Sequence, residues 1–142
     1  MTNGADKESW LKELQLRGKG TFWEMLGGEI VEVSQERAVV ALDAEKRHFN
    51  PMGMVHGGVT ASLLDNAMGL AVLARSPGMN AVTTNLNVQY VAPVGVGRVT
   101  VTAHVLHASR STVSVEGKAV DGEGNLCGIG TASFRLLPLT NA

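Results

Sequence analysis

The pattern of apolar and polar positions divides the chain into an N-terminal helical part and a longer part rich in strands. Apolar side chains at helical spacing predict a short amphipathic helix over residues 7–17, and residues 22–26 predict one further helical turn. From residue 30 the period changes, and two apolar runs flank a polar turn at 34–37. This second pattern predicts a β-hairpin.

The most apolar segment, residues 56–74, predicts one long helix. It contains no run of β-branched residues, and Ser76-Pro77-Gly78 ends it. Its apolar side chains lie nearly all round the helix, so we expect other structure to enclose it. The residues before it, 43–55, are punctuated by Asn50-Pro51 and Gly53, which predicts a loop.

Beyond residue 80 the period is two, which predicts four consecutive antiparallel strands, the last over 126–137. Together with the hairpin and the long helix, these strands indicate an α+β fold in which one helix lies against a single curved sheet. In the first of the four strands one face is expected to carry Val82, Thr84, Leu86, Val88 and Tyr90, and the other Thr83, Asn85, Asn87 and Gln89.

Composition narrows the class of protein. The 142 residues fit one domain, and with 12 basic and 13 acidic residues the formal charge is −1. Neither nucleic acid nor an anionic membrane is therefore an expected partner. One cysteine excludes a disulfide framework within the chain, the first residues lack the pattern of a signal peptide, and the longest apolar stretch, about 67–74, is too short to span a bilayer. We expect a soluble, reduced, cytoplasmic protein.

Two features of the long helix carry candidate chemistry. Gly57 and Gly58 stand at its start, where backbone N–H groups have no partner within the helix and can hold a developing oxyanion. A tight turn or close packing explains the same glycines equally simply. Asp65 is a carboxylate within an otherwise apolar helix, so it is solvated, paired or functional.

The spacing of these two features bears on assembly. Gly57 and Asp65 are eight residues apart, or roughly 12 Å along one helix. An oxyanion donor and a base must both lie within a few Å of one carbonyl. If both act, the site combines Gly57 of one chain with Asp65 of another, most simply across a two-fold axis with antiparallel helices.

The segment from His48 to Gly58 carries a family resemblance. The run His48-x-Asn50-Pro51-x-Gly53-x-Val55-His56-Gly57-Gly58, followed by Asp65, resembles the hotdog-fold acyl-CoA thioesterases, and within them the PaaI-like subgroup of phenylacetic-acid degradation and thioesterase superfamily member 2-type enzymes. The resemblance covers about residues 22–137. It implies a hotdog domain, with the central helix wrapped by an antiparallel sheet of five or six strands.

The resemblance also implies catalytic roles for four residues. Asp65 matches the catalytic carboxylate, acting as general base on water or as nucleophile, and the Gly57 N–H matches the group that polarises the thioester carbonyl. Asn50 matches a polar residue that holds the carbonyl or the water. Thr83 falls where relatives place a water-orienting hydroxyl, and Thr84 takes this role if the register slips by one.

Further residues are expected to bind the substrate or shape its pocket. His56 matches a position that fixes the loop, and Gly58 follows it in the motif. Arg110 fits where relatives place a basic residue near the CoA phosphates, with Arg98 as a weaker candidate. We expect the acyl pocket to be lined by residues such as Leu64, Met68 and Val82, together with Met52 or Met54.

The reaction that the resemblance implies is hydrolysis of an acyl-CoA thioester, with no metal and no cofactor. The histidines His48, His104 and His107 show no metal-ligand spacing with carboxylates. We expect residues 1–21 to form a helical extension and 22–142 the hotdog domain, in a homodimer as active unit and a homotetramer overall. Two alternatives are a non-catalytic acyl-CoA binding module and a scaffolding oligomer. The resemblance also disfavours hydration, because the enoyl-CoA hydratases of this fold carry an aspartate and a histidine in one loop, and here the loop has no aspartate beside His48 and Asn50.

Overall fold

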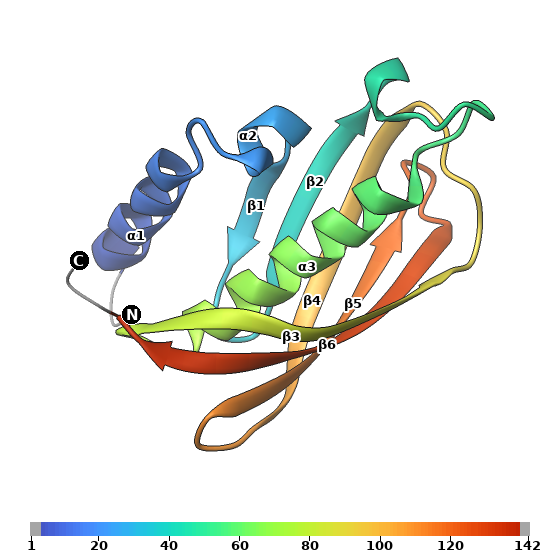
Figure 1. Cartoon of the computed structure of the whole chain (residues 1–142). Coiled ribbons are helices and arrows are strands. Elements are labelled where there is room, and N and C mark those ends of the chain that lie inside the picture. The colour runs from blue at the N-terminus through green and yellow to red at the C-terminus, as the bar shows by residue number, and fades with distance from the viewer. Residues whose placement is uncertain (1–3, 140–142) are drawn as a thin grey trace.

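A computed structural model describes residues 4–139. Residues 1–3 of the expected helical extension and 140–142 of the expected hotdog domain lie outside the described residues. Two short helices precede the sheet, and one long helix crosses it (Figure 1). The helices are α1 (Gly4–Arg17), α2 (Phe22–Leu26), the 3₁₀ turn η1 (Lys46–His48) and α3 (Gly57–Ala74). The strands are β1 (Glu29–Val33), β2 (Ala38–Ala44), β3 (Met79–Tyr90), β4 (Gly97–Ala108), β5 (Thr112–Val120) and β6 (Leu126–Pro138).

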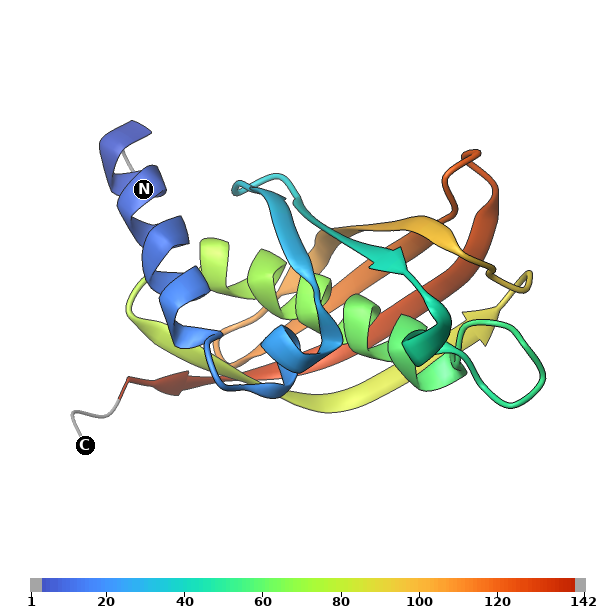
Figure 2. The same ribbon diagram turned by 90° about the horizontal axis from the view of Figure 1, so that it is seen from above.

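The six strands form one antiparallel sheet in the order β1-β2-β4-β5-β6-β3. The sheet curves round α3, so that the helix lies in its concave face (Figures 1 and 2). This arrangement confirms the predicted α+β fold with one enclosed helix. Its two edge strands are β1 and β3.

The concave face accepts α3 closely because glycines stand opposite its large side chains. Leu64 and Met68 are fully buried and pack against Gly117 of β5 and Gly130 of β6. A Cβ atom at Gly117 would lie 3.1 Å from Leu64 Cδ2. Leu64 and Met68, one helical turn apart, therefore fill the core instead of lining the expected acyl pocket.

The enclosed helix has the length and hydropathy of a membrane-spanning helix, which differs from the expectation that no apolar stretch is long enough. By composition alone Gly57–Ala74 is long and apolar enough to cross a bilayer, although half of it is buried inside this fold. An apolar core helix passes the same test.

Strand β3 departs from the predicted alternation. Its pairing with β6 shifts register between Thr83 and Asn85, which leaves Thr84 as the extra residue of a β-bulge. Thr83 faces α3, whereas the Thr84 hydroxyl donates to the Ser133 carbonyl at 3.0 Å. The prediction that Val82 and Thr84 share a face with the later residues of the strand is therefore wrong. The bulge reverses which face of the sheet the side chains after it point to, relative to those before it.

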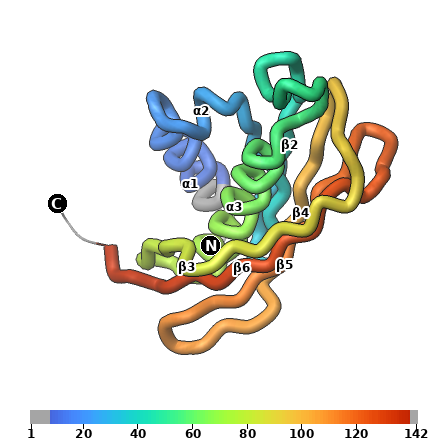
Figure 3. Tube along the Cα trace, turned by 45° about the vertical axis from the view of Figure 1, so that its right-hand side comes forward, coloured from blue at the N-terminus to red at the C-terminus, as the bar shows by residue number. Residues whose placement is uncertain are grey.

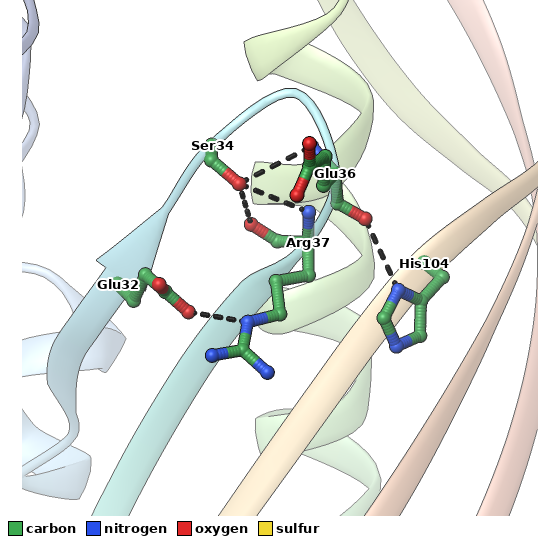
Figure 4. A network of polar contacts seen from close by, with 5 residues as sticks. All are labelled: Glu32, Ser34, Glu36, Arg37 and His104. Carbon is green, nitrogen blue, oxygen red and sulfur yellow. Dashed lines mark hydrogen bonds and ion pairs between the residues drawn. The ribbon is translucent and has the colours of Figure 1, made fainter.

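The hairpin of β1 and β2 is closed by a polar turn (Figure 4). Ser34 Oγ accepts hydrogen bonds from the backbone N–H groups of Glu36 and Arg37. The Arg37 guanidinium pairs with Glu32, and His104 of β4 donates from Nδ1 to the Glu36 carbonyl at 3.1 Å. These contacts fix the turn beside the neighbouring strand.

The N-terminal helices lie beside α3 (Figure 3). Three apolar side chains of α1, at helical spacing, and one of α2 pack against the core. These residues are Trp10, Leu11, Leu14 and Trp23. The predicted amphipathic helix is present, and it starts at Gly4 where residue 7 was expected.

Candidate active site

The start of α3 presents one backbone donor. His56 is the N-cap, and its Nδ1 accepts the Gly58 N–H at 2.8 Å. The Gly57 N–H has no acceptor among residues 4–139, and it lies at the positive end of an 18-residue helix. Of the two motif glycines, Gly57 therefore has the free N–H donor, whereas the Gly58 N–H is used in the hydrogen bond to the N-cap side chain.

The loop before α3 is held by a buried histidine. His48 donates from Nε2 to the Leu26 carbonyl at 2.8 Å and accepts the Glu45 N–H on Nδ1 at 3.0 Å. Its own carbonyl accepts the His56 N–H at 2.8 Å. His48 thus ties the end of α2 and the end of β2 to the N-cap of α3, which fixes where the free donor points.

Asn50 is placed next to this donor. Its Oδ1 accepts the N–H groups of Met52 and Met54, at 3.0 and 3.3 Å, so the carboxamide oxygen shapes the loop. The side-chain Nδ2 donates to no described residue. Asn50 and Gly57 both line a cavity of about 460 Å³. Two N–H donors, one from backbone and one from a side chain, therefore border the same space.

Three residues of this first cavity with a hydroxyl or thiol group were not predicted as site residues. Tyr90, the chain's one tyrosine, donates its hydroxyl to the Gly57 carbonyl at 2.7 Å. Thr60 is buried one turn into α3, and Cys127 is buried on β6. Burial raises the pKa of the Cys127 thiol, so the thiol stays protonated at neutral pH and is a poor nucleophile. Of these three residues, only Thr60 had a signal in the sequence, because it lies three residues after Gly57 and so on the same face of the predicted helix.

Asp65 lies in a second cavity, of about 340 Å³, on another part of α3. It is half-buried, and its Oδ1 accepts a hydrogen bond from the Thr83 hydroxyl at 2.7 Å. No described residue donates to Oδ2. Thr83 therefore orients the carboxylate and leaves one oxygen available, and it is Thr83 rather than Thr84 that contacts Asp65.

The two cavities share no lining residue. Gly57 and Asn50 border the first, Asp65 and Thr83 border the second, and about 12 Å of helix separates Gly57 from Asp65. No single carbonyl carbon reaches both groups within one chain. The chain therefore places the two candidate groups, called half-sites here, in separate cavities.

The remaining predicted binding residues lie away from both half-sites. Arg110 is exposed in the turn between β4 and β5, which lies at the other end of the sheet from the loop before α3 (Figure 1). Arg98 pairs with Glu29 and Asp43, and the hydrogen bonds to these carboxylates raise the pKa of its guanidinium. Val82 is exposed on β3. The structure thus brings neither arginine to either of these two cavities.

The predicted methionines behave differently from one another. Met54 lines the first cavity, next to Asn50. Met52 is 77% exposed at the tip of the loop. Of the expected pocket residues, Met54 alone borders one of these two cavities.

Comparisons with known proteins agree with this architecture. The model of the Thioesterase superfamily matches residues 52–128, just over half of the chain. Acyl-coenzyme A thioesterase 13 of Homo sapiens is 32% identical over 96 residues, which are 66% of this chain and 69% of that protein. In the Mus musculus protein of the same name the match spans 59% of its length.

Two further similarities concern a bacterial enzyme and a solved structure. The 1,4-dihydroxy-2-naphthoyl-CoA hydrolase of Listeria monocytogenes is 33% identical over 99 residues, which are 69% of this chain and 80% of that protein. The structure of the E. coli PaaI protein superposes with a TM-score of 0.81 at 20% identity, over 94% of this chain and 95% of that one, a likeness of fold. The chain therefore belongs to the thioesterase superfamily, and it has the hotdog fold that the PaaI protein also has.

Proposed function

We propose that this thioesterase hydrolyses an acyl-CoA thioester in a site assembled from the two half-sites of different subunits. The proposal rests on one observation about α3. Its Gly57 N–H has no acceptor among the described residues, and its Asp65 carboxylate, which Thr83 orients, lies too far from Gly57 to act on the same substrate within one chain. The CoA thioesters named for the human and Listeria relatives support the substrate class.

The chemistry follows from the charges that develop. The thioester carbonyl oxygen accepts the Gly57 N–H, with the Asn50 amide as a second donor, so the oxyanion forms at the positive end of α3. Asp65 of the other subunit uses its free oxygen to take a proton from water or to attack the carbonyl carbon. In the first case the water oxygen bonds to the carbonyl carbon, the C–S bond breaks, and the CoA thiolate takes the proton that Asp65 removed from water. In the second case Asp65 forms an acyl anhydride as the C–S bond breaks, and water then hydrolyses the anhydride to release the acid and a proton for the thiolate. We propose no cofactor and no metal for this reaction, since CoA is part of the substrate.

The free edge of the sheet supports a two-fold dimer. β3 is an edge strand of twelve residues, and its side chains Val82, Leu86 and Tyr90 are 47%, 37% and 56% exposed. Such an edge readily pairs with a second copy. α3 contacts β3 and lies along it (Figure 1), so antiparallel pairing of two β3 strands would set the two α3 helices side by side in opposite directions. Gly57 of each would then approach Asp65 of the other.

Subunit mixing tests the shared site. Asp65→Asn and Gly57→Pro chains are each expected to be nearly inactive, because each lacks one half of every site. After unfolding and refolding together in equal amounts, half of the dimers are mixed, and each mixed dimer holds one intact site. Thiol release is then expected to recover to about a quarter of the wild-type rate.

Two controls make the mixing result decisive. Each variant refolded alone must stay inactive, and wild type refolded alone must regain full turnover. Recovery to about a quarter supports a site shared between chains. A mixture that stays as inactive as its components, with mixed dimers shown by mass spectrometry, contradicts it.

The hydrogen bond between Thr83 and Asp65 yields a separate prediction. Thr83→Val keeps the shape of the side chain but removes the hydroxyl, so the carboxylate loses its orienting donor. We expect kcat to fall roughly 10-fold, in line with a hydrogen bond to a charged group. Thr83→Ser keeps the donor and is expected to stay within about twofold of wild type. Equal rates in the Val and Ser variants would remove this role.

A further inference from the structure

The cavity that contains Asp65 is bordered on one side by the N-terminal part of the chain. Its wall includes Leu14 and Arg17 of α1, Thr21 before α2, and Trp23 of α2. On the far side it is bounded by α3, β3 and β6. The segment 14–23 therefore borders the same space as the carboxylate, although it precedes the sheet in sequence.

The lining of this cavity combines a few polar side chains with a larger number of apolar ones. Asp65, Asn66 and Thr83 form its polar part, from α3 and β3. Arg17 is the other charged group, and its guanidinium is paired with Glu13 at 2.8 Å. The rest is largely apolar: Leu14, Trp23, Ile30, Leu70, Leu73 and Phe134. An apolar group attached to a carbonyl near Asp65 therefore finds an apolar wall next to it.

Trp23 is a fixed part of that wall. Its indole lies against Gly28, so closely that a Cβ atom there would come within 2.2 Å of the ring. α2 itself is anchored: Leu26 is buried, and the Arg47 guanidinium donates to the Met25 carbonyl at 2.7 Å. The indole is therefore held in place by the turn that follows α2, as a positioned wall requires.

We propose that this cavity receives the acyl group and that Trp23, with the N-terminal segment 14–23, sets the size of acyl group accepted. The inference rests on the proposed function. At about 340 Å³ the cavity is near the lower end of the range for small-molecule sites, about 300–1,000 Å³. It fits a compact acyl group, aryl or medium-chain, and excludes a long fatty acyl chain by the wall of α1 and α2.

The first test is a substrate panel with two tryptophan variants. Trp23→Ala is expected to raise the ratio of kcat/KM for dodecanoyl-CoA over hexanoyl-CoA by at least about 10-fold, since one methylene in an apolar pocket already changes specificity by about that much. Trp23→Leu, a smaller change, is expected to give an intermediate ratio and guards against misfolding of the alanine variant.

Trp10 provides the matched control. It is the only other tryptophan and also packs against the core from the N-terminal region, but it does not line the Asp65 cavity. Trp10→Ala is expected to leave the dodecanoyl to hexanoyl ratio within twofold of wild type. A ratio unchanged in both folded Trp23 variants, or changed equally by Trp10→Ala, would overturn the inference.

A binding measurement separates this inference from the proposed function. In a Trp10→Phe, Asp65→Asn chain, Trp23 is the single tryptophan and turnover is not required. Hexanoyl-CoA is expected to change the emission of Trp23 saturably, whereas CoA alone leaves it unchanged. An equal response to CoA and hexanoyl-CoA contradicts acyl binding beside Trp23. If the emission responds only to hexanoyl-CoA but the wild type releases no thiol, the inference stands and hydrolysis fails.

Discussion

Replacement of Asp65 by asparagine is expected to lower kcat about 10³-fold, within the usual contribution of a positioned acid–base group. Asparagine keeps the size of the side chain and an oxygen to accept the Thr83 hydroxyl, so the cavity and the hydrogen bond survive. What disappears is the negative charge that takes the proton or attacks the carbonyl. The measurement is thiol release from acyl-CoA thioesters, from phenylacetyl and hydroxybenzoyl to fatty acyl.

Asp43→Asn is the control for this substitution. Asp43 is an exposed carboxylate on β2 that pairs with Arg98 and lines neither cavity, so the Asp43→Asn variant is expected to turn over substrate at the wild-type rate. Full turnover by Asp65→Asn would remove the central assignment. A wild type that binds CoA saturably but releases no thiol from any thioester would instead identify a non-catalytic acyl-CoA binding module.

Replacement of Gly57 by proline is expected to lower kcat by about 10²–10³-fold, the usual cost of one oxyanion donor. Proline deletes the N–H but suits the first position of a helix, and the preceding His56, at φ −59° and ψ 136°, already has the extended backbone that proline requires. The fold should therefore be retained while the donor is lost. The measurement is steady-state kcat together with the melting temperature.

Gly57→Ala is matched to this change. Alanine and proline both place a Cβ about 3.2 Å from the Tyr90 ring, so both disturb that contact, but alanine keeps the N–H. We expect the alanine variant to retain at least a tenth of wild-type kcat. If alanine and proline reduce kcat equally, crowding against Tyr90 explains the loss and the oxyanion role fails.

The order of elements was predictable because each has a strong local pattern. The all-round apolar character of residues 57–74 predicted an enclosed helix, and period-two stretches predicted the strands. The eight-residue separation of Gly57 and Asp65 along a helix predicted that the two lie too far apart for one substrate. In the structure the two residues line separate cavities.

Other parts of the site depended on packing that no local pattern encodes. Apolar residues on an all-round apolar helix do not reveal which of them meets the sheet, so the burial of Leu64 and Met68 against Gly117 and Gly130 was not visible. The place of Trp23 beside Asp65 is likewise a contact between distant segments. The bulge at Thr84 has no glycine or proline to mark it.

That bulge allows one strand to serve both ends of α3. Thr83 and Tyr90 are seven residues apart, an odd number, and in a regular strand residues at odd separation point to opposite faces. With the extra residue, both side chains turn toward the helix, one to Asp65 and the other to Gly57. A regular strand with the same seven-residue spacing would keep the Thr83 contact but turn the tyrosine out to the convex face, so the one extra residue lets a single strand contact both ends of the helix.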